Sequence, residues 1–87
     1  MPSAWSDRAW DEYLYWQTQD KKTQKKINEL IKSIHRDGAM NGLGHPEKLK
    51  HRIGVLSREI NKKDRLVYSY DVNGLLWIIS CRGHYDD

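Results

Sequence analysis

A polar segment at the end of the chain carries side chains that can take part in proton transfer. It contains Arg82, His84 and Tyr85, and it directly follows the apolar run of residues 75–79. A run so short and apolar predicts a strand buried on both faces of a sheet. Histidine has the unperturbed pKa closest to neutrality, so a histidine at the end of that strand can donate or accept a proton. The alternative is that the strand simply ends in a polar C-terminus.

A carboxylate and two arginines could complete an acid–base site with this histidine. Glu47 lies in a loop between cationic residues and forms a possible acid–base pair with His84. Arg58 and Arg65 could stabilise charge that develops on a phosphoryl group. Such a set suits RNA cleavage without a metal, in which a base activates the 2′-hydroxyl and an acid protonates the leaving 5′-oxygen. Tyr85 could stack on a base or position the phosphate. A carboxylate beside cations is equally an ordinary surface feature.

Length and composition limit the kind of protein. Eighty-seven residues predict one domain, spanning 1–87, with a modest core. The single cysteine, Cys81, suits a reducing compartment and is predicted to be a small buried hydrophobe without a catalytic role. The four scattered histidines lack metal-ligand spacing, so we expect no metal and no cofactor. Neither a signal peptide nor a membrane-spanning run is recognisable, which predicts a cytoplasmic protein without membrane association.

Charge is segregated along the chain. The net charge of +3 combines −3 in residues 1–20, +8 in residues 21–65 and −2 in residues 66–87. Segregation of this kind indicates a basic surface suited to a polyanion. It is also typical of a solvated lysine-rich helix face, and charge alone does not separate the two interpretations.

The first half of the chain predicts two helices. Ser6 is a good N-cap for a helix over 7–19, and a second helix runs from about Lys21 to Arg36, with Gly38 as its stop. The apolar positions of the second helix match helical spacing in full: Ile27, Leu30, Ile31 and Ile34. With about one residue between them, the helices should form an αα-hairpin.

The second half of the chain predicts an antiparallel meander. Residues 38–47 form a glycine-rich loop that leads into a charged bend. Strands are then expected at 53–60, 65–70 and 75–82, the last two joined at a turn that contains Asn73 and Gly74; residues 3–5 could add a short edge strand. The predicted fold class is α+β, a two-helix hairpin packed on an antiparallel sheet of three or four strands. The meander could bring Arg58, Arg65 and His84 together, although register is not readable from sequence.

Seven segments, in order along essentially the whole chain, carry a resemblance to a known family. They are residues 5–6, 10–17, 25–32, 44–51, 57–60, 65–68 and 81–85. In these motifs the chain resembles the YoeB/Txe family of toxins in the RelE superfamily. The resemblance implies the toxin of a toxin–antitoxin pair, a ribosome-dependent endoribonuclease that cleaves mRNA in the ribosomal A site and inhibits translation.

The resemblance also implies site residues and partners. Glu47 would be the general base, His84 the general acid, and Arg65 would stabilise the transition-state phosphate. Lys50 and Arg58 would assist, and Tyr85 would orient the substrate. The implied partners are a YefM/Axe-like antitoxin whose C-terminal segment covers the site, the ribosome with its mRNA, and a second copy in a possible homodimer. The lysine-rich second helix would then face ribosomal RNA.

Two other functions are compatible with these residues. One is a non-catalytic toxin of the same fold that acts by binding, such as a topoisomerase poison; the other is a basic nucleic-acid-binding module. The joint presence of Glu47, Arg65 and His84 favours the catalyst. The chain departs from the family pattern at three places that bear on rate, which are Glu59, Gly83 and the pair Asp86–Asp87.

Overall fold

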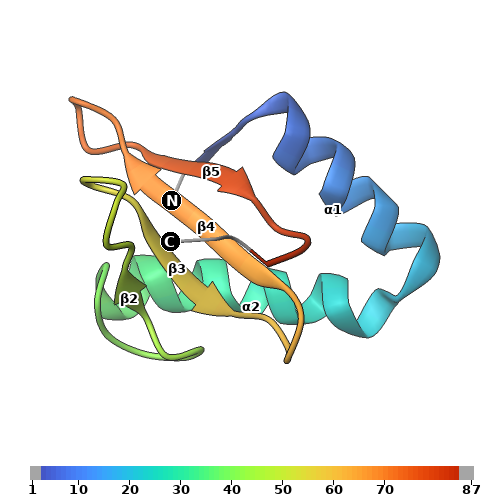
Figure 1. Ribbon diagram of the computed structural model, residues 1–87. Helices are drawn as coiled ribbons and strands as arrows, with labels where there is room; N and C mark the ends of the chain where they lie inside the picture. Colours follow the sequence, from blue (N-terminus) through green and yellow to red (C-terminus); the bar gives the residue numbers. More distant parts are fainter. Residues whose placement is uncertain (1–2, 85–87) are drawn as a thin grey trace.

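Two helices and five strands make up the structure, a computed structural model that describes residues 3–84 (Figure 1). In chain order the elements are β1 (Ser3–Trp5), α1 (Asp7–Gln19), α2 (Lys21–Asp37), β2 (Glu47–Lys48), β3 (Leu56–Glu59), β4 (Arg65–Tyr70) and β5 (Leu76–Ser80). The predicted α+β class and the helix hairpin are confirmed. The sheet has five strands, one more than the upper limit predicted.

The helix hairpin is built around a single residue, Asp20. Its backbone amide closes α1 by donating to Trp16 O at 2.9 Å, and its carboxylate caps α2 by accepting from Lys22 N at 3.1 Å and Thr23 N at 3.4 Å. The bond from Thr23 Oγ1 (2.8 Å) contributes most to lowering the pKa of this carboxyl. The predicted caps Ser6 and Gly38 are also present. Across residues 3–84, neither helix is long and apolar enough to cross a membrane.

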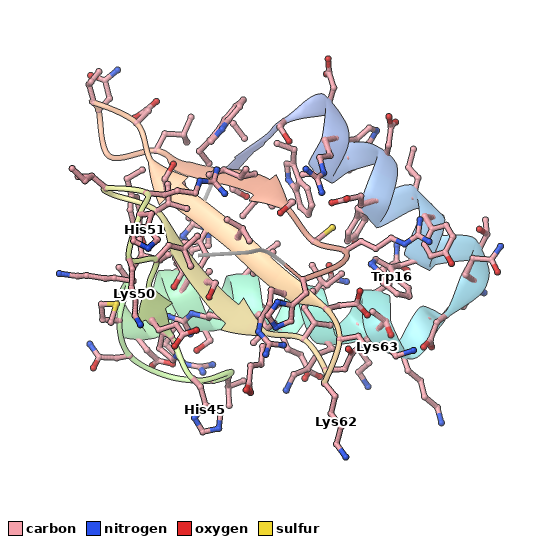
Figure 2. The ribbon with its side chains drawn as sticks, viewed as in Figure 1. Trp16, His45, Lys50, His51, Lys62 and Lys63 are labelled. Atoms are coloured by element: carbon pink, nitrogen blue, oxygen red, sulfur yellow. The ribbon has the colours of Figure 1, made fainter. Side chains whose placement is uncertain are left out.

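Helix α1 fastens the segment that follows β5. The amide of Cys81 donates to Glu12 Oε1 at 2.8 Å, and the carbonyl of Cys81 accepts from Trp16 Nε1 at 2.9 Å. Trp16 projects from α1 toward this segment (Figure 2). At the other end of α1, Ser6 Oγ donates to Ile79 O at 2.7 Å. The N-terminal helix therefore sets the path along which the chain leaves the sheet.

The strand order is β1-β5-β4-β3-β2, so the first and last strands of the chain are neighbours. β1 pairs with β5 in parallel, and every other pair is antiparallel. The extra strand is β2, which lies in the segment predicted as a charged bend; Glu47 pairs with Ser57 and Lys48 with Leu56. A strand of two residues carries no sequence periodicity, which explains why it was missed.

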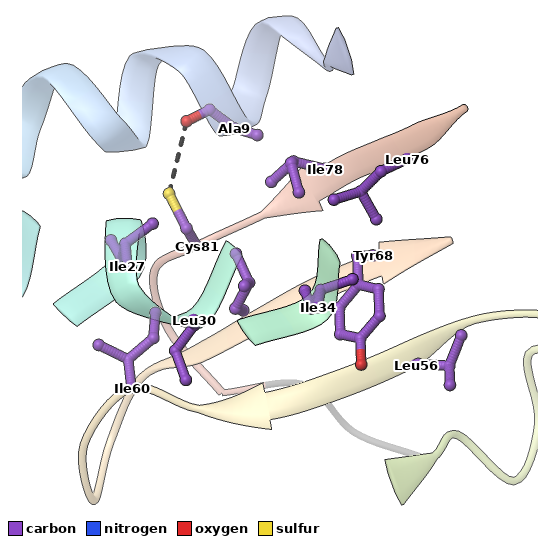
Figure 3. Close-up of a cluster of buried hydrophobic side chains, with 11 residues drawn as sticks. Ala9, Ile27, Leu30, Ile34, Leu56, Ile60, Tyr68, Leu76, Ile78 and Cys81 are labelled. Atoms are coloured by element: carbon purple, nitrogen blue, oxygen red, sulfur yellow. Dashed lines mark hydrogen bonds between the residues drawn. The ribbon is translucent and has the colours of Figure 1, made fainter. Parts of the chain in front are cut away.

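The core lies between the helices and one face of the sheet (Figure 3). Ile27, Leu30 and Ile34 from α2 pack against side chains from the strands, and each is at most 2% exposed. Cys81 is fully buried, as predicted, and its thiol donates to Ala9 O at 3.5 Å. Burial raises the pKa of the Cys81 thiol to about 12, which leaves no thiolate for chemistry near neutral pH.

The prediction that the last strand is buried on both faces is wrong. In β5, Leu76 and Ile78 are buried whereas Trp77 between them is 38% exposed. This alternation is expected where helices cover only one side of a sheet; α2 crosses behind the strands in Figure 1. The other side, called here the helix-free face, carries the candidate site.

Candidate active site on the helix-free face

A row of paired residues runs across the helix-free face. Glu47 pairs with Ser57, Ser57 with Val67, and Val67 with Ser80. Directly paired residues project to the same side of a sheet. The core residues Leu56, Leu66 and Tyr68 occupy the alternate positions, so the row lies on the opposite side from the helices. Glu47 is exposed at the β2 end of this row.

His84 reaches the same row from its other end. It lines a pocket of about 190 Å³ together with Val67 and Ser80, which belong to the row. Neighbouring strands lie about 4.8 Å apart, so Glu47, two strands from Val67, is roughly 10 Å from the pocket floor. The structure therefore brings Glu47 and His84, 37 positions apart in the sequence, to one face of the sheet.

An irregularity at the end of β5 helps to bring this about. The register shifts between Val67 and Tyr68, whose partners are Ser80 and Ile78. One residue along β4 thus corresponds to two residues along β5, which is the pattern of a β-bulge. A bulge changes the direction in which side chains project and can end strand pairing. Ser80 consequently lies on the helix-free face although Ile78, two residues earlier, lies in the core.

The backbone before His84 is held by the β3–β4 turn. Gly83 N donates to Asp64 Oδ1 at 2.7 Å, and Gly83 O accepts from Arg65 N at 3.1 Å. Gly83 has φ +87°, a conformation that residues with a Cβ rarely adopt. Glycine at this position is therefore matched to a turn that is bonded on both sides. Asp64 itself is 9% exposed and also accepts from Asn61 Nδ2 at 3.0 Å.

The backbone of Arg65 bonds to Gly83, the residue before His84, whereas the side chain of Arg65 lines a separate groove. Its Nη1 donates to Asn61 O at 2.9 Å and to Asp64 O at 3.3 Å. The groove, of about 540 Å³, is lined by Arg65 together with Lys26, His45, Glu59 and Lys62, among others. His45 and Lys62 project on this side of the molecule (Figure 2). Arg65 thus lines the groove with its side chain and bonds through its amide to Gly83, a residue that lines the His84 pocket.

Lys50 follows β2 in an exposed segment close to His51 (Figure 2). The segment is anchored by the bond from Leu49 N to Val55 O at 3.0 Å. Lys50 therefore lies near Glu47 along the chain, at the edge of the helix-free face.

Arg58 requires a correction. It was predicted to bind substrate, and the meander could have brought it together with Arg65 and His84. It instead pairs with Leu66 in the core-facing set and is fully buried. Its guanidinium donates to Tyr68 Oη at 3.0 Å and to Ser33 Oγ at 3.1 Å. It also donates to three loop carbonyls at 2.7–2.9 Å, those of Gly38, Asn41 and Leu43. A guanidinium used in this way has no surface to offer a substrate.

Tyr85, predicted to orient the substrate, lies outside the described residues, as do Asp86 and Asp87.

Sequence reasoning missed three residues near His84. Arg8 and Arg52 line its pocket, and Asp64 holds the backbone before it. Arg8 is separated from His84 by nearly the whole chain, and the parallel pairing of β1 with β5, together with the bonds from α1 to Cys81, brings the two ends together. Asp64 lies in the polar segment 61–64 between the predicted strands 53–60 and 65–70. No local pattern in the sequence distinguishes these positions.

Comparison with known proteins identifies the family that this chain resembles over nearly its whole length. Residues 5–85 match the family model described as the YoeB-like toxin of bacterial type II toxin–antitoxin systems. Toxin YoeB of Escherichia coli strain K12 is 50% identical over 86 residues, which cover 98% of this chain and 100% of that protein.

Solved structures agree in fold over the same extent. A YoeB dimer from Staphylococcus aureus superimposes with a TM-score of 0.90 at 49% identity, and 98% of each chain is covered. YoeB in a heterotetrameric YoeB–YefM complex from the same organism gives a TM-score of 0.88 at 50% identity with the same coverage.

Proposed function

Because this chain belongs to the family of YoeB-like toxins of bacterial type II toxin–antitoxin systems, we propose that it is a ribosome-dependent endoribonuclease that cleaves mRNA in the ribosomal A site. The observation that supports the proposal is the placement of Glu47 and His84 on one face of the sheet, with cationic side chains lining the His84 pocket. One base and one acid on the two sides of a phosphodiester are what transesterification of RNA requires.

The chemistry divides between the two groups. The Glu47 carboxylate takes the proton of a 2′-hydroxyl, and the resulting oxygen attacks the adjacent phosphorus. The bond from phosphorus to the 5′-oxygen then breaks, and His84 gives a proton to that leaving oxygen. The products are a 2′,3′-cyclic phosphate and a 5′-hydroxyl, and because the nucleophile belongs to the substrate, the protein needs only to move protons and stabilise charge.

Cations supply the charge stabilisation. Arg65 lines the groove and bonds through its amide to Gly83, next to His84, and Lys50 follows the strand that carries Glu47. In the transition state the equatorial oxygens of phosphorus gain negative charge, which positioned cations stabilise more strongly than they stabilise the ground state. Tyr85, next to the acid in the sequence, is proposed to orient the substrate by stacking.

Contact with the ribosome is assigned to the lysines of α2. Four of them are exposed on that helix: Lys21, Lys22, Lys25 and Lys32. Phosphate contacts of this kind strengthen binding in proportion to the counterions released. A toxin that acts on translating ribosomes works in the cytoplasm, and we assign the chain to that compartment.

Two protein partners follow from the relatives. Staphylococcus aureus YoeB is described both as a dimer and in a complex with YefM. For this chain we propose a YefM/Axe-like antitoxin that covers the helix-free face, and self-association as a homodimer.

Cleavage of mRNA in a translating extract tests the proposal. Glu47→Ala and His84→Ala should each reduce cutting by a factor of about 10²–10⁴, whereas Glu29→Ala, which removes an exposed carboxylate from α2, should not. Undiminished cutting by both site variants would contradict the assignment. Translation arrest by the wild-type protein without any RNA cleavage would instead favour a non-catalytic toxin that acts by binding.

A further inference from the structure

Three arginines from distant parts of the chain surround the His84 pocket. Arg8 comes from the first turn of α1, Arg52 from the segment between β2 and β3, and Arg82 from the residues after β5. The remaining lining residues are Val67, Ile79, Ser80, Gly83 and His84, so no carboxylate lines the pocket among the described residues. A hollow whose charged lining is entirely cationic or titratable favours an anion.

Two of these guanidinium groups are held in place by neighbours. Arg82 lies over the ring of Tyr15, with its Cζ 3.7 Å from the ring centroid, a stacked cation–π arrangement. Arg8 Nε donates to Glu12 Oε2 at 3.1 Å, and Glu12 is itself fixed by the amide of Cys81. The Arg8 side chain nevertheless remains 72% exposed. Pre-oriented guanidinium groups lose less conformational entropy when they bind a phosphate.

The size and position of the pocket indicate what it binds. At about 190 Å³ it is smaller than the roughly 300–1,000 Å³ typical of small-molecule sites, which suits a single charged group. It also shares Val67 and Ser80 with the row that begins at Glu47. Ser57, Val67 and Ser80 of this row are at most 9% exposed, whereas Glu47 and His84 at its two ends are exposed. A polyanion on this face would therefore contact Glu47 and His84 and then the three arginines.

We propose that Arg8, Arg52 and Arg82 form a subsite for a second phosphate of the substrate strand, next to the scissile phosphate. The inference rests on the proposed function, since it takes His84 as the group beside the reacting bond. It extends the RNA footprint from one phosphodiester to two and assigns Arg guanidinium groups, which can bind phosphate oxygens bidentately, to the outer one.

Binding of uncleavable RNA tests the subsite. Fluorescence anisotropy is measured with 2′-O-methyl oligonucleotides in a length series from two nucleotides upward, with wild type, Arg8→Gln/Arg52→Gln and Lys22→Gln/Lys32→Gln. The two double variants lose the same charge, but the lysines belong to α2 and lie outside the pocket. All four substituted side chains are exposed, and matching melting temperatures check that the variants fold.

We expect added nucleotides at one end to raise the affinity of the wild type and of the lysine variant, but not that of the arginine variant. With the longer RNA the arginine variant should bind about tenfold more weakly, and its slope against log salt should be smaller by about 1.4, or roughly 0.7 for each cation. Arg8→Lys/Arg52→Lys should recover the salt slope and only part of the affinity, because lysine binds phosphate as a point charge.

Three results would overturn the subsite. If the arginine and lysine double variants lose equal RNA affinity, the arginines contribute only general charge attraction. If the arginine double variant binds RNA as the wild type does but binds hexaglutamate more weakly, the pocket is a site for an acidic protein segment. If the arginine double variant binds ribosomes without mRNA more weakly than the wild type does, the phosphate that the pocket binds belongs to ribosomal RNA. The measurement involves no cleavage, so a protein that binds as expected but cuts no mRNA would contradict the proposed function and leave the subsite standing.

Discussion

A buried arginine organises the loop that leads to the candidate base. Arg58 donates to the carbonyls of Gly38, Asn41 and Leu43, and Glu59 N donates to Gly44 O at 2.7 Å. Loop 38–44 is therefore attached to β3 by hydrogen bonds, in addition to the packing of Ala39 against the core. Burial raises the pKa of Tyr68, whose hydroxyl extends this network by donating to Ala39 O at 2.6 Å. The residue that sequence analysis assigned to the substrate instead supports the segment that ends at Glu47.

Replacing Arg58 should therefore destabilise the fold. Arg58→Met removes the donor from two buried and three partly buried hydrogen bonds. A buried acceptor left unpaired costs about 1–3 kcal/mol, so we expect urea unfolding to show a loss of about 3 kcal/mol or more. Arg58→Lys should not restore stability, because one ammonium cannot reproduce the planar fork of donors. Arg52→Met removes an exposed arginine and should change stability by no more than about 0.5 kcal/mol. Equal stability of the Arg58→Met variant and the wild type would contradict the supporting role.

Helices were the elements best predicted from sequence, and short strands the worst. The bounds of α1 were predicted correctly, and α2 ends one residue later than predicted, at Asp37. Both helices have a capping side chain and a sustained apolar period, which are local signals. β2 has neither, because its formation depends on pairing with β3. Strand order and face likewise depend on contacts between distant segments, so the sequence alone did not predict them.

Asp20, the residue between the two helices, gives a prediction about how stability depends on pH. The folded state lowers the pKa of Asp20, chiefly through the Thr23 hydroxyl, below its ordinary 3.8. The folded state thus favours the charged carboxylate, so this contribution is present above about pH 4 and is lost as the pH falls through the lowered pKa. Asp20→Ala should lower Tm by about 4–8 °C at pH 7.

The difference between Asp20→Ala and wild type should narrow as Tm is followed from pH 5 down to pH 2. Asp20→Asn keeps a good cap without a charge, so its Tm should lie closer to the wild-type value at pH 7 and show a weaker dependence on pH. A Tm difference between Asp20→Ala and wild type that stays constant over this range would exclude the carboxylate as its source.

At the scale of the whole molecule, the position of His84 depends on where the first and last strands of the chain meet. The parallel pair of β1 with β5, the bulge at the end of β5 and the bonds from α1 to Cys81 together determine where His84 lies. Sequence analysis identified Glu47 and His84 as a pair through chemistry and family resemblance. It placed Arg58 wrongly because the period of two gives parity within a strand but not which parity faces the helices.

The β3–β4 turn connects this assembly to the proposed catalysis and gives a test at the same scale. Asp64 binds the amide of Gly83, directly before His84, so we expect it to act as a positioning residue. Asp64→Ala should reduce kcat for mRNA cleavage by about 10–100-fold, since a shift of about 1 Å in a catalytic group can cost that much. KM should change little, because no contact with bound substrate is removed. Asp64→Asn keeps an oxygen that can accept from Gly83 and should retain most of the activity.

Asp71→Ala provides the matched control for Asp64. Asp71 Oδ1 accepts from Asn73 N and Leu75 N, both at 2.8 Å, within the β4–β5 turn, so its loss disturbs a turn of the same kind away from His84. If both alanine variants lose activity in proportion to their loss of Tm, Asp64 only stabilises the fold. A fall in kcat at unchanged KM that occurs in Asp64→Ala but not in Asp71→Ala or Asp64→Asn would support the positioning role. His84 would then depend on a side chain twenty positions earlier in the chain, because the bond that holds the backbone before it comes from the β3–β4 turn.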